Sequence, residues 1–439
     1  MVKGGDGLDK SLKQTISAPQ GVALYVGAVL GSGILILPGM TGGIAGANAL
    51  ISWTLMILLS VPLACTFAFL SIDHPSSGGV ATFANKAFGH YTGALIGWFF
   101  FIAGSIGQII VSLTGGTYIA FAFQLPHYVA YIIAGALLVI SVTGNYFGLK
   151  TSGKMQLGIA ALTFFILLGT IFLAMPSIRY DNLVWNVVPN SIKPISQCVM
   201  LIFWSFFGWE AISSLAPEFK NPRKKNILIS TVGAIIIVGI LYIGIAFAVI
   251  GTNSYSIGNE NMNEAMNHAS LSEVVTKGIG KNGGWATGIV AFTICLGTMN
   301  AFVASMSRLG YSLAKDNIAP SWLSKINEKY STPSGAVLVV GSIAAIGLLA
   351  SYIFKIELEQ LVFIPNSLGI ATYIVGSAAG VKLIKHLVGK VFAAIACILC
   401  FTAYFFVGSF LLIPILVSIC CFSYLYIKSK QSNKLAKEA

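Results

Sequence analysis

Twelve apolar stretches follow one another along the chain and constrain its fold more than any other feature. A helix needs about 20 mainly apolar residues to cross a bilayer, and lipid admits only helices or closed barrels. Hydrophobic residues make up 56% of the chain and charged residues 9%, against about 25% charged in soluble domains. We therefore expect an all-α integral membrane protein with twelve transmembrane helices, near residues 20–44, 47–71, 92–123, 128–143, 155–175, 195–216, 227–251, 284–311, 334–354, 358–381, 389–407 and 409–427.

These stretches define one transmembrane domain over residues 20–427, between cytoplasmic tails at 1–19 and 428–439. The second tail is short and rich in lysine, and we expect it to be disordered. The longest polar stretch, 252–283, lies outside the membrane in this arrangement and has room for a short surface helix.

The net charge of +12 follows this topology. With the N-terminus in the cytoplasm, 21 of the 26 Lys and Arg residues fall on the inside, as the positive-inside rule requires. The basic excess therefore indicates orientation in a lipid bilayer and not a nucleic-acid partner. The five outside residues are Arg179, Lys193, Lys277, Lys281 and Lys355.

Glycines interrupt the first and the sixth apolar stretch near mid-bilayer depth. The first break is Gly31-Ser32-Gly33, and the second centres on Gly208. Five spans separate the two, an odd number, so the second copy crosses in the opposite direction. Interrupted helices at matching positions of inverted halves are typical of transporter binding sites. We expect repeats over residues 20–175 and 195–381, with two further helices over 389–427.

The first break is suited to a zwitterion. The half-helix that begins after Gly33 offers N–H groups and a partial positive charge to a carboxylate. The half-helix that ends near Val29 and Leu30 offers carbonyls to an ammonium group, and the Ser32 hydroxyl adds a donor. This favours an amino acid over a sugar or a simple cation. The alternative is that these glycines only allow close helix packing.

Glu210 is the one acidic residue that we place deep in a span. A carboxylate there costs about 2.5–3.5 kcal/mol on insertion scales, so its presence indicates a use. It is a candidate to bind a coupling proton, or else to accept hydrogen bonds from the unwound backbone of the first span. Beside it, Trp204 and Phe207 are candidates to wall an apolar pocket.

Other chemistry has little support in the sequence. Hydroxyl and amide groups at Thr298, Asn300, Ser305 and Ser307 are candidate Na⁺ ligands, but such groups more often bond to their own helix. We find no nucleophile with a base, no metal-spaced ligand set and no phosphate-binding loop. We therefore expect no enzyme activity, no cofactor and no metal site.

Several motifs together resemble the amino acid–polyamine–organocation superfamily. Gly31-Ser-Gly-Ile34 with Pro38 is similar to its first-helix signature, and Phe203-Trp-Ser-Phe-Phe-Gly-Trp-Glu210 with Glu218-Phe-Lys-Asn-Pro222 to its sixth. Pro75-Ser-Ser-Gly-Gly79, Ser307-Arg308, Ala314-Lys-Asp316 and Pro320 also fit. The stretches 74–80 and 214–222 most resemble bacterial exporters of methionine and branched-chain amino acids.

The resemblance implies the leucine-transporter-type fold, with a 5+5 inverted repeat, and alternating access. It implies that the substrate carboxylate meets the backbone at Ser32 and Gly33, and that the ammonium meets carbonyls near Ala28 and in the sixth span. Some proton-coupled relatives carry a lysine well inside the fifth span, whereas here Lys154 stands at its cytoplasmic start. The implied substrate-binding residues are Ala28, Gly31, Ser32, Gly33, Ile34, Phe203, Trp204, Phe207, Gly208 and Phe302, with Glu210 as the acid of proton-sensitive cycling.

The sequence thus predicts a secondary transporter of neutral, mostly apolar L-amino acids in a bacterial cell membrane. Export, proton-coupled uptake and exchange stay open, as do the coupling ion and the oligomeric state. The alternative from another class is a non-transporting membrane sensor or scaffold on the same fold.

Overall fold

The computed structural model describes residues 14–75, 79–148, 153–257 and 261–438. In these residues the chain is helical, and its pairings outside helices are two isolated bridges. The all-α membrane class is thus confirmed. The main helices are α1 (Ala18–Val29), α2 (Gly33–Ala45), α3 (Ala49–Asp73), α4 (Gly79–Phe88), α5 (His90–Ala122), α6 (His127–Tyr146), α7 (Gly153–Ala174), α8 (Ile192–Ile202), α9 (Ala211–Leu215), α10 (Arg223–Gly251), α11 (Asn261–His268), α12 (Ser270–Ile279), α13 (Lys281–Lys315), α14 (Ser334–Phe354), α15 (Leu358–Leu383), α16 (Leu387–Tyr404) and α17 (Leu412–Glu438).

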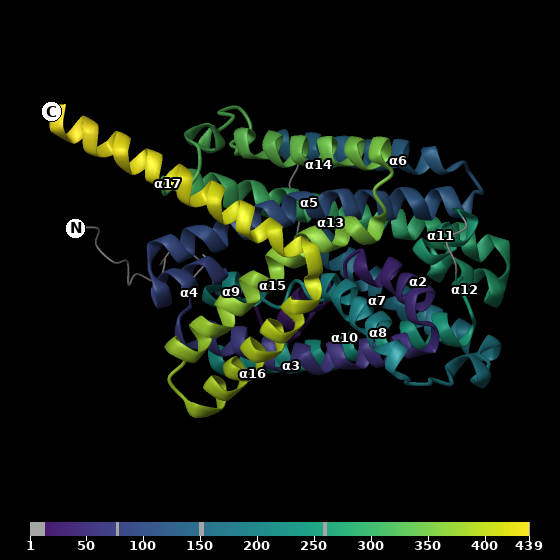
Figure 1. Ribbon diagram of the computed structural model, residues 1–439. Coiled ribbons are helices and arrows are strands. Elements are labelled where there is room, and N and C mark those ends of the chain that lie inside the picture. The colour runs from purple at the N-terminus through teal and green to yellow at the C-terminus, as the bar shows by residue number, and fades with distance from the viewer. Residues whose placement is uncertain (1–13, 76–78, 149–152, 258–260, 439) are drawn as a thin grey trace.

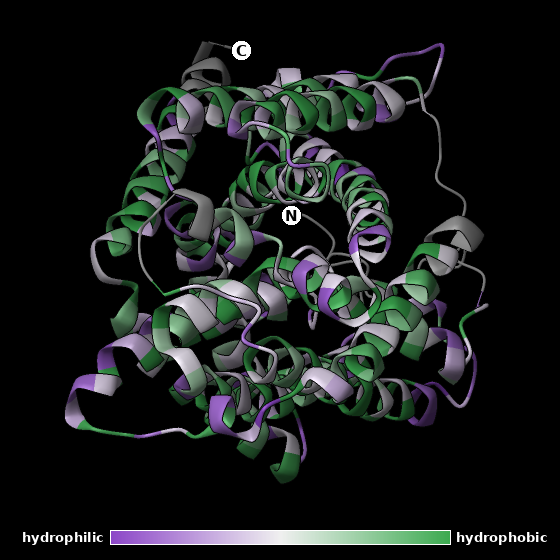
Figure 2. Ribbon diagram, turned by 90° about the vertical axis from the view of Figure 1, so that its right-hand side faces the viewer, coloured by the Kyte–Doolittle hydropathy of each residue, from purple (hydrophilic) through white to green (hydrophobic). Residues whose placement is uncertain are grey.

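Nine helical segments of the described residues are long and apolar enough to cross a membrane. Two of them are double: Gly33–Asp73 contains α2 and α3, and Leu387–Lys430 contains α16 and most of α17. Some of the expected spans agree closely with a helix of the structure. The span expected over residues 334–354, for instance, is the helix α14, Ser334–Phe354. A view along the bundle shows mostly hydrophobic helices, with hydrophilic residues gathered in the loops (Figure 2).

The long helices run in two layers that enclose the broken ones. In Figure 1, α5, α6, α13 and α14 form the upper layer, and α3 and α10 lie below. The helix α15 packs on α5, α3 and α16 and so connects the layers. The short helices α4 and α9 lie at one end of the bundle, and α11 and α12 lie at the other (Figure 1).

Both expected interruptions are confirmed. The helix α1 ends at Val29, and α2 begins three residues later at Gly33. In the sixth stretch, α8 passes into a 3₁₀ turn over Phe203–Phe206, Phe207 is extended, and Gly208 has φ +128°. Glycine adopts this φ without strain, whereas a residue with a Cβ rarely does.

Side chains from the long helices satisfy carbonyls around both breaks. Tyr118 of α5 donates to the Leu35 carbonyl at 2.6 Å, and Asn366 of α15 donates to the Met200 carbonyl at 2.6 Å. Irregular backbone at membrane depth persists only where protein or a cavity meets its hydrogen bonds. The breaks are therefore built into the packing of the bundle.

At the end of the bundle that carries α9, the segment before α1 pairs with the segment after α9. Ile16 and Phe219 form a parallel bridge, in which Ile16 N–H donates to the Glu218 carbonyl at 3.0 Å and Lys220 N–H to the Ile16 carbonyl at 2.9 Å. Phe219 is fully buried. The helices α1 and α9 are thus joined at the ends that lie away from the breaks; we call this pairing the terminal clamp.

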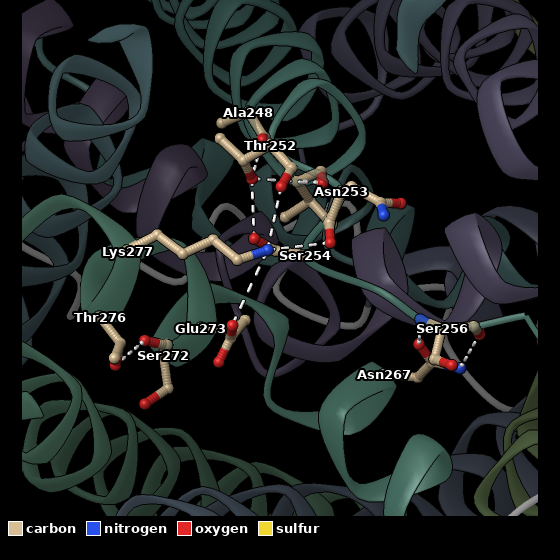
Figure 3. Close-up of polar contacts among 11 residues, drawn as sticks. Ala248, Thr252, Asn253, Ser254, Ser256, Asn267, Ser272, Glu273, Thr276 and Lys277 are labelled. Carbon is tan, nitrogen blue, oxygen red and sulfur yellow. Dashed lines mark hydrogen bonds and ion pairs between the residues drawn. The ribbon is translucent and has the colours of Figure 1, made fainter. Parts of the chain in front are cut away.

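The outer loop holds two helices, α11 and α12, where one surface helix was expected. They are partly a core element, because Leu271 and Val274 of α12 are fully buried. Lys277 reaches the end of α10, where its Nζ donates to the carbonyls of Thr252 at 3.0 Å and Asn253 at 2.9 Å (Figure 3). A cation suits the negative end of the helix dipole.

The C-terminal tail was expected to be disordered, but it is helical, since α17 continues to Glu438. No Gly or Pro follows Pro414, and Lys, Gln, Leu, Ala and Glu are good helix formers. Three expectations fall partly outside the described residues: most of the first tail, the centre of the Pro75–Gly79 motif, and Glu260 of the outer loop.

Candidate substrate site between the broken helices

A cavity lies between the two breaks. It is small, with a free volume of about 50 Å³. Both broken helices contribute, together with α5, α13 and α15. Its lining residues are Ala28, Val29, Gly31, Ser32, Gly33, Phe100, Ala103, Gly104, Val111, Trp204, Ser205, Phe207, Glu210, Thr298, Phe302, Met306, Pro365 and Gly369.

Eight of the eleven residues selected from the sequence line this cavity: Ala28, Gly31, Ser32, Gly33, Trp204, Phe207, Glu210 and Phe302. The other three lie behind its wall. Ile34 and Phe203 are fully buried in the core, since a helix turns the next residue away from the cavity. Gly208 backs onto α1, where a Cβ would stand 2.9 Å from the Ala28 carbonyl oxygen. Direct contact of these three with a ligand in the cavity is therefore not supported.

Two hydroxyl groups of the lining have no hydrogen-bond partner among the described residues: Ser32 Oγ and Ser205 Oγ. Both side chains are buried, 2% and 3% exposed. An unpartnered buried hydroxyl costs about 1–3 kcal/mol. Ser32 directly precedes α2 without capping it, and the first N–H groups of a helix lack partners within the helix. The break thus presents unused donors at one wall of the cavity.

Carbonyl acceptors stand beside these donors. Val29 and Ser205 both line the cavity, and the hydroxyl of Tyr242 on α10 lies 2.8 Å from each of their carbonyl oxygens. The hydroxyl of Tyr242 therefore bridges the two breaks. Gly33 brings them closer still, because a Cβ there would meet the Ser205 Cα at 3.0 Å.

Glu210 is bonded within its own break and to α15. Its Oε2 accepts from the Gly208 N–H at 3.0 Å and from the Tyr373 hydroxyl. The sequence suggested the backbone of the first span as its structural partner, and that partner is wrong. The carboxylate is close enough in sequence to fold back on the Gly208 amide, which the break leaves without a helical acceptor.

The apolar walls are aromatic side chains seated against glycines. A Cβ at Gly107 would stand 2.6 Å from the Trp204 ring, and one at Gly369 would stand 2.1 Å from the Phe207 ring. Phe207 further packs against Tyr373, with ring centroids 5.4 Å apart. Glycines on α5 and α15 thus leave the space that lets these two aromatic rings reach the breaks.

Sequence reasoning missed the contribution of α5 and α15. Phe100, Ala103, Gly104 and Val111 share one face of α5, at helical spacings of three, four and eleven residues. The small residues Ala103 and Gly104 carried a weak signal for close approach. Because α5 is apolar around much of its circumference, hydropathy alone did not distinguish the cavity face from the other buried faces.

The candidate Na⁺ ligands of α13 do not converge. Thr298 lines the cavity, but Asn300 accepts from Asn145 of α6 at 2.6 Å. Ser307 donates to the carbonyl of Ala304 in its own helix, and Ser305 is exposed. No cluster of three His, Cys, Asp or Glu side chains suited to a metal occurs in the described ranges.

Comparison with known proteins agrees with this architecture. The family model described as amino acid permease matches residues 16–425. The chain belongs to the amino acid permease family. It is 32% identical over 424 residues, 96% of this chain and 97% of the relative, to the uncharacterized amino acid permease YecA of Bacillus subtilis (strain 168).

Two further relatives carry more specific names. The L-methionine/branched-chain amino acid exporter YjeH of Escherichia coli (strain K12) is 28% identical, over 85% of this chain and 87% of the relative. The branched-chain amino acid permease BcaP of Bacillus subtilis (strain 168) is 26% identical, over 81% and 78%. This permease is thus a multi-pass membrane transporter of amino acids and not an enzyme.

Proposed function

We propose that this permease carries neutral, mostly apolar L-amino acids across the cell membrane by alternating access, as a secondary transporter. The observation that supports this most is the pairing of unused donors and carbonyl acceptors at the two breaks. Donors for a carboxylate and acceptors for an ammonium are what the invariant part of an amino acid requires.

In this proposal the carboxylate binds at Ser32 and Gly33, on the N-terminal end of α2. The ammonium binds among the carbonyls of the two breaks, near Ala28, Val29 and Ser205. The side chain then faces Trp204, Phe207, Phe302 and the wall of α5. Among the lining residues only Glu210 is acidic and none is basic, so an uncharged side chain fits best.

The twelve-span topology also belongs to this proposal. The helices α1 and α2 form one interrupted span, α8 and α9 another, and α3, α5, α6, α7, α10, α13, α14, α15, α16 and α17 complete the count. The breaks fall in the first and sixth spans, which supports a 5+5 inverted repeat with α16 and α17 outside it. The excess of lysine and arginine supports cytoplasmic termini.

The direction of transport has two candidate answers. The printed name of YjeH, an exporter of L-methionine and branched-chain amino acids, favours export. Proton-coupled uptake or exchange is the alternative, in which Glu210 is the candidate proton-binding group; the name of BcaP, a branched-chain amino acid permease, gives no direction. Lys154 lies in the first turn of α7, at the end of this span and not in its middle.

Flux in proteoliposomes tests the proposal. We expect saturable transport of labelled L-leucine and L-methionine, with competition by L-isoleucine and L-valine but not by L-lysine or L-glutamate. Empty liposomes are the control, and an imposed pH gradient of either sign tests whether flux is coupled to protons. A protein that is folded and inserted but gives no saturable flux with any of these amino acids would favour the sensor or scaffold alternative.

A further inference from the structure

Tyr242 contacts both broken helices at once. Its hydroxyl lies 2.8 Å from the Val29 carbonyl oxygen, where α1 ends, and 2.8 Å from the Ser205 carbonyl oxygen in the second break. Tyr242 is itself on α10, an unbroken helix, and is fully buried. A residue of the scaffold therefore sets the position of one break relative to the other.

The ring of Tyr242 is held on two sides. Trp53 of α3 meets it edge-on with centroids 5.4 Å apart, and Phe206 meets it at 5.2 Å and 81°. Such edge-to-face contacts fix the ring plane. The hydroxyl oxygen therefore has little freedom to move towards one carbonyl oxygen and away from the other.

The hydrogen-bond count at this point is uneven. A tyrosine hydroxyl has one proton to donate, but two carbonyl oxygens face it at equal distance. The Val29 carbonyl also accepts the Gly31 N–H at 2.8 Å, so the Ser205 carbonyl is the acceptor left without a donor when the tyrosine proton goes to Val29. Both Val29 and Ser205 line the cavity, so a ligand with several N–H donors can reach the acceptor that the tyrosine proton leaves.

We infer that Tyr242 is a positioning residue for the substrate ammonium. It holds the carbonyls of Val29 and Ser205 together, bonds one of them, and leaves the other for an N–H of the ligand. The ammonium role rests on the proposed function. The bracing of the two breaks rests only on the contacts of Tyr242 and stands without a ligand.

Tyr118 provides a matched control. It is also fully buried in a long helix and also donates to a backbone carbonyl, that of Leu35 at 2.6 Å. It faces a single acceptor inside α2 and does not line the cavity. Tyr118→Phe and Tyr242→Phe each remove one buried hydroxyl and keep the ring, so a general loss of stability affects both.

The first measurement is binding to the purified full-length protein. The probes are L-leucine and 4-methylpentanoate, which is leucine without its ammonium group. We expect Tyr242→Phe to weaken L-leucine binding at least tenfold and to leave 4-methylpentanoate unchanged, so that the ratio of the two affinities falls. Tyr118→Phe should keep this ratio. An unchanged ratio in Tyr242→Phe would overturn the ammonium role.

The second measurement is amide hydrogen exchange without ligand. We expect Tyr242→Phe to speed exchange at residues 206–209 at least threefold relative to the parent and to Tyr118→Phe. Equal rates would overturn the brace. The parent protein could bind no L-leucine while exchange still accelerates in Tyr242→Phe. The proposed substrate and the ammonium role of Tyr242 would then both be wrong, whereas the bracing of the two breaks by Tyr242 would be supported.

Discussion

The hydroxyl of Tyr373 on α15 donates a hydrogen bond to the carboxylate of Glu210 in the second break. The same hydroxyl lies 3.2 Å from the Phe206 carbonyl oxygen, and its ring packs against Phe203 and Phe207. The one acidic side chain of the cavity is thereby linked to an aromatic wall of that cavity. A change in the charge of Glu210 alters a bond that helps to place Phe207.

Glu210→Gln should flatten the pH dependence of flux. Glutamine keeps an oxygen to accept from Gly208 N–H and Tyr373, but it has no proton to gain or lose. The measurement is initial flux of L-leucine in proteoliposomes from pH 5 to pH 8. Glu218→Gln, outside the cavity lining, is the control. If the Glu210→Gln and parent profiles overlay, Glu210 is not the proton-sensitive group.

Gly31→Ala should weaken amino-acid binding without unfolding the protein. A Cβ at Gly31 lines the cavity and meets only Thr298 Cγ2, at 3.8 Å. We expect Kd to rise about tenfold, since overpacking costs about 1–3 kcal/mol and 1.4 kcal/mol is tenfold. Gly135→Ala, where a Cβ meets nothing within 4 Å, is the control. Equal Kd values for both variants would place the ligand elsewhere.

Gly33→Leu should abolish binding, although for a different reason than the sequence suggested. The sequence indicated that a side chain there fills the carboxylate site. In the structure it first meets Ser205, whose Oγ and Cα lie 2.3 and 3.0 Å from the Cβ position. The two breaks must then separate. A thermal-shift titration with L-leucine should show no stabilisation, and a parent-like response would contradict the close contact of the breaks.

Lys277→Met should loosen the junction between α12 and α10. The ammonium donates to two carbonyls at the end of α10, while its 3.7 Å ion pair with Glu273 is partly exposed and contributes little. Burial lowers the pKa of Lys277, which marks the cost of holding a charge there. We expect a loss of about 1 kcal/mol, seen as a Tm lower by about 2 °C. Lys281→Met is the control and should leave Tm unchanged.

Mild acid should destabilise the outer loop through His268, the last residue of α11. Burial, and then the neighbouring His127, lowers the pKa of His268 to about 4. Its ordinary pKa is 6.5, so between these values the unfolded segment binds a proton that the folded one does not. Stability therefore falls as the pH drops from 6.5 towards 4. Hydrogen exchange across residues 265–279 should accelerate in this range for the parent and less for His268→Gln.

Local signals were enough to predict the breaks and several helix ends. The closely spaced Gly31 and Gly33, and Gly208 beside aromatic residues, weaken the helix locally, and the ends of α14 and α15 follow from polar residues beside apolar runs. The cavity residues of the broken helices could be predicted for the same reason, since the sequence neighbours of a break lie near it in space.

Contacts between distant segments could not be predicted in this way. Tyr242 lies 37 residues from Ser205 and 213 from Val29, and Tyr373 lies 167 residues from Phe206. Nothing in their local pattern marks them as different from the other tyrosines. Likewise, the tail was misread because its lysines are equally compatible with a loop and with a continued α17.

The terminal clamp has a mechanical consequence. Residues 15–16 and 218–220 are tied by backbone hydrogen bonds, so a rotation of α1 about Leu30 would carry α9 with it. The two helices would then move together as one unit. A truncation or fusion that displaces Thr15 would therefore also displace α9, which follows the break at Gly208. Changes to the chain ahead of α1 should thus alter transport as well as expression.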